Sequence, residues 1–442
     1  MDSSHAAGQS GVMRDVVVIG GGVVGIAVAY ELARAGAAVT VLERESELAT
    51  ECSSGNAGMV SSTHAFPIAS PTALMQGLRW MWRPDSPFKL RPRTHLLPWL
   101  ARFTAASTPG RADRAGALLV QLTQLGVELH AELADAGLNE SLVRRGLLDA
   151  YETEAGIEAG RSEIAARHAR GLTGELLSRE ELLEAEPALS PDLLGGAFYP
   201  DEAYCDPLLF ARGLAAAATE LGVRFRCGVE VLAPAKAGGR IVALETTAGR
   251  IAVDQVVLAA GVWSPPLARD IGLYLPIEGA KGYHLEVESQ SGTPRLPVYM
   301  MESKVVATPL EGRLRLSGTL ELDGMDTRVD PVRVGAIRRA GDHHFPAIRG
   351  AAVRNVWRGL RPCPPDGLPM IGRVEELENL LVATGHGVGG TTLAPITAQL
   401  VREIVQGLPP SVDLELMRPD RFRRLLPSRN RAANGSQAPV PA

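Results

Sequence analysis

Three glycines near the N-terminus have the spacing of a turn that holds a dinucleotide. Gly20, Gly22 and Gly25 follow the β-branched run Asp15–Ile19 in a G-x-G-x-x-G pattern. The first glycine permits a tight turn, the second lets the backbone approach a pyrophosphate, and the third lets the following helix pack against the strand. Glu43 stands where a carboxylate accepts ribose hydroxyls and repels a 2′-phosphate. The pattern predicts a dinucleotide in contact with Val18, Ile19, Gly20, Gly21, Gly22, Val23, Val24, Gly25, Glu43 and Arg44.

The elements around these glycines have the order that such a site needs. Asp15–Ile19 and Val39–Leu42 have the composition of strands and Val23–Ala35 that of a helix, which gives a strand–helix–strand unit. The helix N-terminus then faces the phosphates with free N–H groups. Val16–Leu32 also resembles the apolar stretch of a signal peptide, but its glycines favour the strand, turn and helix.

Composition narrows the class of protein. The chain has 442 residues, 45% of them hydrophobic, which suffices for two closely joined globular domains. A net charge of -5 and a pI near 6.0 give no general attraction to nucleic acid. The four cysteines are scattered, with no Cys-x-x-Cys pair and no histidine at metal-ligand spacing. We therefore expect no metal site, no nucleic-acid partner and reduced thiols in a cytoplasmic protein.

The rest of the chain alternates between helical and strand patterns. Helical patterns occupy three stretches before the middle of the chain: 111–170, a helix opened by the Ser178–Glu181 capping box, and a helix from Asp206 to about 221. Strand patterns occupy 224–232, 256–260 and 380–383, and the alternation over 283–322 predicts an antiparallel sheet with one covered face. A glycine-rich turn, 385–390, precedes a last helix over 391–406.

These patterns predict a discontinuous arrangement of two domains. The cofactor domain is assigned to 14–105, 200–275 and 355–425. A substrate domain of helices and an antiparallel sheet is assigned to 106–199 and 276–354. Residues 1–13 and 426–442 are small and polar, or rich in Pro, Ser, Asn and Ala, and we expect flexible tails there.

Five further motifs resemble one family of flavoproteins. Over about 15–407 the chain is similar to the D-amino-acid oxidase superfamily of FAD-dependent oxidoreductases, and within it to bacterial D-amino-acid dehydrogenases. The motifs are Ser54–Gly58, Lys281–Tyr283, Trp357–Pro362, Pro365–Gly367 and Gly385–Gly387. The resemblance implies an α/β fold with a Rossmann-type, glutathione-reductase-like FAD domain and an α+β substrate domain on an antiparallel sheet. It also implies oxidation of D-amino acids to 2-oxo acids and ammonia by hydride transfer from Cα to the flavin N5.

The same resemblance extends the cofactor site. Residues 256–264 are similar to the second FAD-contacting strand of such flavoproteins, and Val231 matches a main-chain contact to adenine. The turn before the last helix offers free N–H groups, which suit the negative charge of a reduced flavin near N1. The added cofactor residues are Asn56, Ala57, Gly58, Val231, Ala260, Gly261, Trp263, Gly387, Val388, Gly389, Gly390 and Thr391.

Three residues are candidates for contact with the substrate. The resemblance makes Arg361 the clamp for the substrate carboxylate, because a guanidinium holds a carboxylate by two parallel bonds, whereas Arg358 suits a structural ion pair. Tyr283 is a second candidate contact, and 303–308, where several relatives have a tyrosine, contains none. His386 fits a general base, but a packing or backbone role fits it equally well.

A basic and aromatic segment predicts where the electrons go. The segment 79–93 contains one acid, Asp85, and five basic residues: Arg79, Arg83, Lys89, Arg91 and Arg93. Three of the five tryptophans of the chain lie in the same region, Trp80, Trp82 and Trp99. Such residues suit an anionic membrane surface, so 79–99 is a candidate peripheral contact on the inner face of the plasma membrane. Electrons then pass to a quinone, with oxygen as the alternative acceptor. The alternative for the segment is half-buried tryptophans and arginines that face water.

Two other functions remain open at this stage. One is a secondary-amine oxidase or dehydrogenase of the same superfamily, acting on a sarcosine-, D-proline- or D-hydroxyproline-like substrate. The other is a non-catalytic flavoprotein subunit, against which Arg361 argues. The substrate side chain, the electron acceptor, the oligomeric state and a covalent tether of FAD through Cys52 also stay open.

Overall fold

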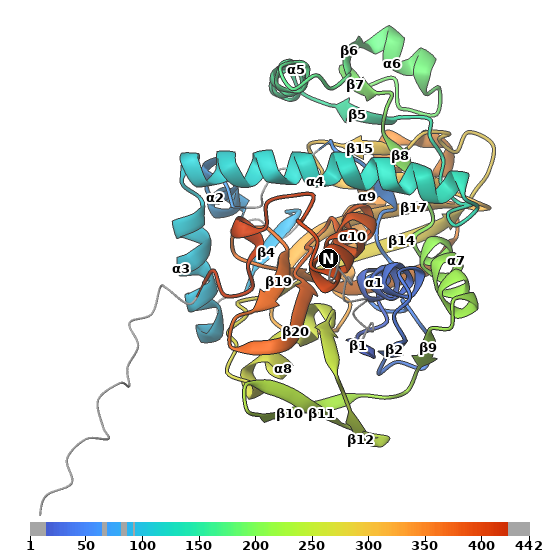
Figure 1. The fold of residues 1–442 in the computed structure, drawn as a ribbon. Coiled ribbons are helices and arrows are strands. Elements are labelled where there is room, and N and C mark those ends of the chain that lie inside the picture. Colours follow the sequence, from blue (N-terminus) through green and yellow to red (C-terminus); the bar gives the residue numbers. More distant parts are fainter. Residues whose placement is uncertain (1–14, 64–68, 81–85, 92, 423–442) are drawn as a thin grey trace, which may run out of the picture.

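The strands of the molecule sort mainly into two large sheets (Figure 1). The computed structural model describes residues 15–63, 69–80, 86–91 and 93–422, without the side chains of residues 76 and 78–80. The predicted tails 1–13 and 426–442 lie outside this part of the chain. So do residues 81–85.

A six-stranded sheet is built around β1 and is parallel except for its edge strand β19. Its residues alternate between two cores: Val16 and Val18 face one hydrophobic cluster, and Val17 and Ile19 face the other. Burial on both faces explains the unbroken apolar run of β1. In spatial order the strands are β19 (Met370–Val374), β20 (Leu377–Thr384), β13 (Gln255–Leu258), β1 (Val16–Ile19), β2 (Val39–Leu42) and β9 (Arg224–Arg226).

Helices cover one face of this sheet and a small sheet covers the other. The first face carries α1 (Val23–Arg34), α7 (Pro207–Glu220) and α10 (Gly390–Gln406), and the long α4 (Pro109–Asp135) lies over α10. The opposite face carries α8 (Ser264–Asp270) and an antiparallel sheet of β10 (Val231–Ala237), β11 (Arg240–Thr246) and β12 (Gly249–Ala252). The carboxyl ends of β1, β2, β13 and β20 therefore meet the first turns of α1 and α10.

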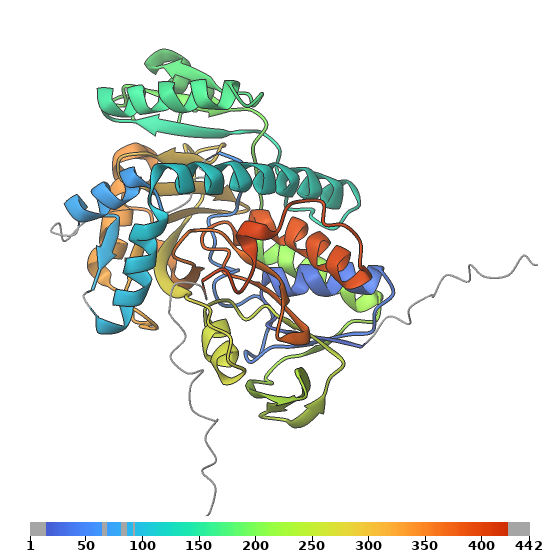
Figure 2. The same ribbon diagram turned by 60° about the vertical axis from the view of Figure 1, so that its left-hand side comes forward.

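A nine-stranded, mostly antiparallel sheet forms the other half. One face of this sheet packs against α9 (Pro331–His344), and the hydrophobic core between them includes Leu285, Leu316 and Ile337. In spatial order it contains β18 (Val353–Cys363), β14 (Glu278–Glu288), β17 (Arg313–Leu322), β16 (Val305–Leu310), β15 (Val298–Met300), β5 (Leu147–Tyr151), β7 (Gly195–Tyr199) and β6 (Glu175–Ser178), and β4 (Phe88–Leu90) pairs with β17. Its far end, with α5 (Glu154–His168) and α6 (Arg179–Ala185), projects as a lobe beyond α4 (Figure 2).

The remaining elements are short or lie at the rim. They are β3 (Met59–Val60) paired with β8 (Ala203–Tyr204), α2 (Pro71–Trp80), α3 (Leu97–Ala106) and the 3-10 turns η1 (Thr94–Leu96), η2 (Gly261–Trp263), η3 (Pro346–Ile348) and η4 (Glu415–Met417). No helix in the described part of the chain is long and apolar enough to cross a membrane.

Most predicted elements are confirmed, and one is wrong. The helices at 23, 207 and 390 begin within a residue of their predicted starts, and the Ser178 capping box is present. The stretch 111–170, predicted to be helical, contains the strand β5 between α4 and α5. β5 is buried along its whole length, so its apolar run shows no strand alternation.

The assignment of the two domains stays a proposal, with two adjustments. β18 pairs along its length with β14, so the boundary at 355 cuts through a strand of the nine-stranded sheet. β4, assigned to the cofactor domain, pairs with β17 in that same sheet. We therefore place 86–90 and 353–363 with the substrate domain.

Candidate active site

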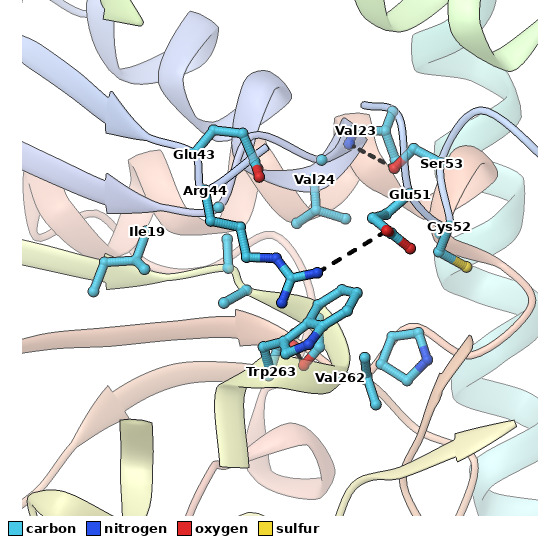
Figure 3. A pocket seen from close by; sticks show the side chains of 18 of the residues that line it. Ile19, Val23, Val24, Glu43, Arg44, Glu51, Cys52, Ser53, Val262 and Trp263 are labelled. Carbon is cyan, nitrogen blue, oxygen red and sulfur yellow. Dashed lines mark hydrogen bonds and ion pairs between the residues drawn. The ribbon is translucent and has the colours of Figure 1, made fainter. Parts of the chain in front are cut away.

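A first cavity of about 310 Å³ lies where the parallel strands of the six-stranded sheet end. It runs along the ends of β1, β2 and β13 and reaches the first turn of α10 (Figure 3). The edge formed by the carboxyl ends of parallel strands is where open α/β sheets bind their ligands. The cavity therefore coincides with the predicted dinucleotide site.

The glycines of the turn have distinct physical roles. A Cβ on Gly20 would lie 2.6 Å from the Ala259 carbonyl oxygen, and one on Gly25 only 1.9 Å from the Gly20 oxygen. These two glycines are required by close backbone packing. A Cβ on Gly22 would meet only the Ser53 Oγ, at 3.3 Å, so this glycine keeps the cavity wall clear. The predicted division of roles among the three glycines agrees with this geometry.

Glu43 is held in place at the adenosine end of the cavity. Its Oε2 accepts a hydrogen bond from the Gly21 N–H at 2.6 Å, and its Oε1 accepts one from the Glu45 N–H at 2.8 Å. A carboxylate has further lone pairs, which remain available to ribose hydroxyls. Beside it the guanidinium of Arg44 lies 3.8 Å from the centre of the Trp263 ring (Figure 3).

The cavity offers donors that a phosphate and a flavin need. The N-cap residues of α1 and α10 are Gly22 and Gly389, which have no side chain to bond the first-turn N–H groups. These N–H groups are therefore left for a ligand. Ser53 binds one of them, the Val23 N–H, at 3.0 Å. The Thr391 hydroxyl is buried in the cavity wall with no hydrogen-bond partner among the described residues. A buried orphan of this kind is expected where a polar ligand belongs.

A second cavity, of about 530 Å³, adjoins the first. The two share four lining residues, Cys52, Asn56, His386 and Gly387. Asn56 ties the two shared segments together, because its Nδ2 donates to the Val388 oxygen at 3.1 Å. One wall of the second cavity is apolar and comes from α2, β4 and α3, with Leu74, Phe88, Leu90, Leu100 and Phe103.

Arg361 lines the second cavity with its charge uncompensated. Its Nη1 donates to the Thr319 oxygen at 2.8 Å, and no carboxylate of the described residues forms an ion pair with it. Thr319 has a φ of 67° at a bulge in the pairing of β14 with β17, which directs its carbonyl toward the guanidinium. A Cβ on Gly282 would lie 2.2 Å from Nη1, so any other residue there would displace the guanidinium from this position.

The neighbouring arginine has the structural role that was expected of it. Arg358 pairs with Glu51 at 3.1 Å and donates to the Thr327 oxygen at 2.9 Å. It lines neither cavity. The two arginines of the Trp357–Pro362 motif therefore differ in that only Arg361 is left to bind an anion.

The predicted contact through Tyr283 is corrected by the structure. Tyr283 is buried in the core of the nine-stranded sheet, its hydroxyl donates to Glu321 at 2.8 Å, and it lines neither cavity. The cavity contains Tyr299 of β15 instead, four residues before the stretch searched in the sequence. Burial raises the pKa of Tyr299 to about 12, against the opposing effect of Arg361. Its phenol therefore stays protonated at neutral pH.

His386 lines both cavities but is poorly suited to act as a base. Its Nε2 is 2.9 Å from the Thr397 hydroxyl, and burial lowers the pKa of His386 to about 4. A neutral imidazole with so low a pKa is a weak proton acceptor. Of the two roles weighed for it, packing at the junction of the cavities fits the geometry better.

The other residues of the predicted site fall into three groups. Fifteen predicted cofactor residues line the first cavity: Ile19, Gly20, Gly22, Val23, Val24, Glu43, Arg44, Asn56, Val231, Ala260, Gly261, Trp263, Gly387, Gly390 and Thr391. Three line the second: Ala57, Val388 and Gly389. Four support the walls without lining either cavity: Val18, Gly21, Gly25 and Gly58.

Cysteine and metal chemistry find no support in the described residues. Burial raises the pKa of Cys52 to about 11, so its thiol is protonated although it faces the cavities. No cluster of His, Cys, Asp and Glu in the described part of the chain could hold a metal ion.

The membrane segment is only partly described. Trp99 is buried and its indole N–H donates to the Cys363 oxygen at 3.0 Å. Lys89, Arg91 and Arg93 pair with Glu321, Asp323 and Asp330 of the protein itself. The side chains of Arg79 and Trp80, and all of Trp82, Arg83 and Asp85, lie outside the described residues.

Known proteins resemble the chain over most of its length. The chain is 36% identical to a D-amino acid dehydrogenase of Paramagnetospirillum magneticum, over 93% of this chain and 99% of that protein. It is 34% identical to one of Sinorhizobium medicae, over 88% and 95%.

Solved structures share the fold. Glycine oxidase from Geobacillus kaustophilus superposes with a TM-score of 0.77 at 26% identity, over 92% of this chain and 99% of that one. L-proline dehydrogenase from P. horikoshii superposes with a TM-score of 0.72 at 21% identity, over 93% and 98%. Residues 15–404 match the model of the DAO family, described as FAD-dependent oxidoreductases. The chain therefore belongs to the DAO family of FAD-dependent oxidoreductases.

Proposed function

We propose that this enzyme oxidises D-amino acids to 2-oxo acids and ammonia. The observation that carries the proposal is Arg361, a guanidinium without a carboxylate partner among the described residues. It lines the second cavity, which adjoins the first, and we propose that the first cavity is the FAD site. The D-amino acid dehydrogenases that resemble the chain over nearly its whole length support the same reaction.

Each residue at the junction of the cavities has a separate task in this proposal. FAD, when bound, supplies the hydride acceptor that converts the amine to an imine, which water hydrolyses to a 2-oxo acid and ammonia. Arg361 holds the substrate carboxylate by two parallel hydrogen bonds and so fixes Cα at the mouth of the FAD site. Tyr299, protonated at neutral pH, forms a wall beside the same carboxylate.

The proposed reaction needs no protein base. A substrate that binds as the neutral amine gives up a hydride from Cα to the acceptor and becomes an iminium, which then releases an N–H proton to water. No side chain has to accept a proton in either step. This agrees with the low pKa of His386, which burial holds at about 4. His386 then fills the junction of the two cavities as a neutral ring bound to Thr397.

A secondary-amine substrate is the second candidate. The second cavity, of about 530 Å³, has room for an N-methyl group or a proline ring beside the carboxylate clamp. L-Proline dehydrogenase and iminodiacetate oxidase are among the solved structures with the same fold. The product distinguishes the candidates: ammonia from a primary amine, formaldehyde from an N-methyl group, and a cyclic imine from a proline ring.

The electron acceptor is proposed to be a quinone at a membrane surface, with oxygen as the alternative. Four residues of the predicted membrane segment form ion pairs or hydrogen bonds within the protein instead: Lys89, Arg91, Arg93 and Trp99. The proposed membrane contact is therefore restricted to the basic and aromatic residues of 79–83. Flotation with anionic vesicles at low salt tests this contact. Absence of binding would overturn it and leave oxygen or a soluble acceptor.

Anaerobic reduction of the bound flavin tests the main proposal. The purified holoenzyme is mixed with D- and L-amino acids, sarcosine and D-hydroxyproline, and bleaching of the visible flavin band is followed. Reduction by D-amino acids, with release of ammonia, supports the proposal. Reduction only by N-substituted amines replaces it with the second candidate.

A further inference from the structure

The second cavity carries two cations and no acid. Among its described lining residues, Arg361 and Lys304 are basic, and none is Asp or Glu. Arg361 is accounted for by the carboxylate that every amino-acid substrate has. Lys304 is not used by the proposed reaction, although it faces the same space.

The ammonium of Lys304 has only one weak interaction partner among the described residues, an aromatic ring. It lies 5.6 Å from the centre of the Tyr299 ring, and no hydrogen bond or ion pair joins it to a described residue. Two acids, Asp149 and Glu302, act on it from farther away. Asp149 accepts hydrogen bonds from the hydroxyls of Tyr151 and Tyr199. Oε1 of Glu302 accepts one from the Thr153 hydroxyl, and its Oε2 is buried without a hydrogen-bond partner among the described residues.

The backbone at Lys304 is strained in a way that marks functional sites. In the described part of the chain, the non-glycine residues with positive φ are Ala49, Lys304 and Thr319, and each lines one of the two cavities. Lys304 has a φ of 54° in the turn between β15 and β16. Such conformations cost on the order of 1 kcal/mol and concentrate at binding sites.

Burial of the ammonium adds an energetic argument. Burial lowers the pKa of Lys304, because the cavity wall replaces water around the charge. A charge that is removed from water without a partner destabilises the protein, whereas an anionic ligand group beside it restores the lost solvation. The free enzyme thus holds a charge that a suitable substrate would neutralise.

Both cations lie around the same tyrosine. Lys304 contacts the Tyr299 ring, and Arg361 is close enough to lower the pKa of the Tyr299 hydroxyl. One ligand of amino-acid size that fills the space beside Tyr299 can therefore interact with Arg361 through its α-carboxylate and with Lys304 through its side chain.

We propose that Lys304 determines the charge specificity of the enzyme. It favours amino acids with a second carboxylate, such as D-glutamate and D-aspartate, over their amides, and it disfavours basic amino acids. The inference rests on the proposed oxidation of amino acids and specifies its substrate class. A charge-assisted contact of this kind is expected to change kcat/KM by about 10- to 100-fold, chiefly through KM.

The test compares three substrates of similar length on the holoenzyme: D-glutamate, D-glutamine and D-lysine. The wild type is expected to prefer them in that order. Lys304→Met should bring the ratio of kcat/KM for D-glutamate and D-glutamine to about 1, and Lys304→Glu should shift the preference toward D-lysine. Lys236→Met is the matched control, since Lys236 lies on β10 outside both cavities and its removal should leave the ratio unchanged.

A binding measurement makes the inference independent of turnover. Glutarate and butyrate differ by one carboxylate, and their dissociation constants follow from the perturbation of the flavin spectrum. Tighter binding of glutarate, lost in Lys304→Met, supports the role of Lys304 even if no amino acid reduces the flavin. Equal binding of the two, or a preference that survives in Lys304→Met, overturns the inference while reduction by D-amino acids would leave the proposed function standing.

Discussion

The first cavity, proposed as the FAD site, and the second, proposed as the substrate cavity, adjoin each other but are built differently. The FAD site lies at the junctions between strands and helices of one parallel sheet, where the Gly20–Gly22 turn and the 385–390 turn bring backbone to the cavity. The substrate cavity is lined by side chains from α2, α3, α4 and five strands of the nine-stranded sheet, β4, β15, β16, β17 and β18. Backbone geometry of this kind tolerates few residue types, whereas a wall of side chains can change one residue at a time. Cofactor chemistry is thus fixed, and substrate choice is adjustable.

The largest expected effect comes from removing the charge of Arg361. Arg361→Met should lower kcat/KM for any amino-acid substrate by about 1000-fold, because two charge-assisted hydrogen bonds to the carboxylate are lost. The FAD content should stay at the wild-type level. Arg358→Met is the matched control, since Arg358 belongs to the same motif but lines neither cavity and already has a carboxylate partner in Glu51, which lines the first cavity. Similar losses in both variants would contradict the role of Arg361 as the clamp.

The second effect addresses the other region and should leave the substrate cavity intact. In Gly22→Ala the new methyl group would meet only the Ser53 Oγ, at 3.3 Å, so the fold is kept, but the methyl group stands where the pyrophosphate approaches. We expect the Kd of FAD to rise by about 10- to 100-fold, measured by flavin fluorescence on the apoprotein. Gly110→Ala is the control, because nothing lies within 4 Å of its Cβ. Unchanged FAD affinity in Gly22→Ala would show that the pyrophosphate lies elsewhere.

The same contrast explains how much could be predicted from the sequence. The strand, turn and helix at 16–34 depend on neighbouring residues, and so the glycine pattern predicted the first cavity well. Arg361 was found through a motif. Tyr299 and Lys304 were missed, because the sheet that positions them pairs β15 with β5, whose residues lie about 150 positions away in the sequence. The bulge at Thr319 and the strand β5 likewise depend on distant pairing and left no local signal.

A smaller effect is expected from the glycine that makes room for Arg361. In Gly282→Ala a Cβ would lie 2.2 Å from the guanidinium, which is the mobile end of a side chain and can move aside at little cost in stability. We expect KM to rise by about 10-fold, with FAD content and melting temperature nearly unchanged. Gly335→Ala on α9 is a matched control, because its Cβ would approach the Arg339 guanidinium at 3.3 Å outside both cavities. A normal KM in Gly282→Ala would show that the position of Arg361 tolerates displacement.

The smallest effect at neutral pH concerns three buried histidines at the segments shared by the two cavities. His130 binds the Thr391 oxygen, His284 binds the Gly55 oxygen, and His386 lies between the cavities. Burial is the main reason that the pKa of each lies at about 4 in the folded protein.

Acid should therefore weaken both sites together. Below a pH of about 6.5 these histidines are protonated in the unfolded chain but stay neutral in the folded chain down to about pH 4. The free energy of unfolding should therefore fall as the pH is lowered from about 6.5 to 4, with a slope of at most about 4 kcal/mol per pH unit. Urea unfolding at a series of pH values measures this slope, and His130→Asn should reduce it. His95→Gln, at a position whose side chain is 51% exposed, should not. Because the histidines support 51–58 and 385–391 alike, flavin release and loss of substrate affinity should coincide. If substrate affinity fell while FAD stayed bound, the substrate cavity would depend on these histidines more than the backbone-built FAD site does.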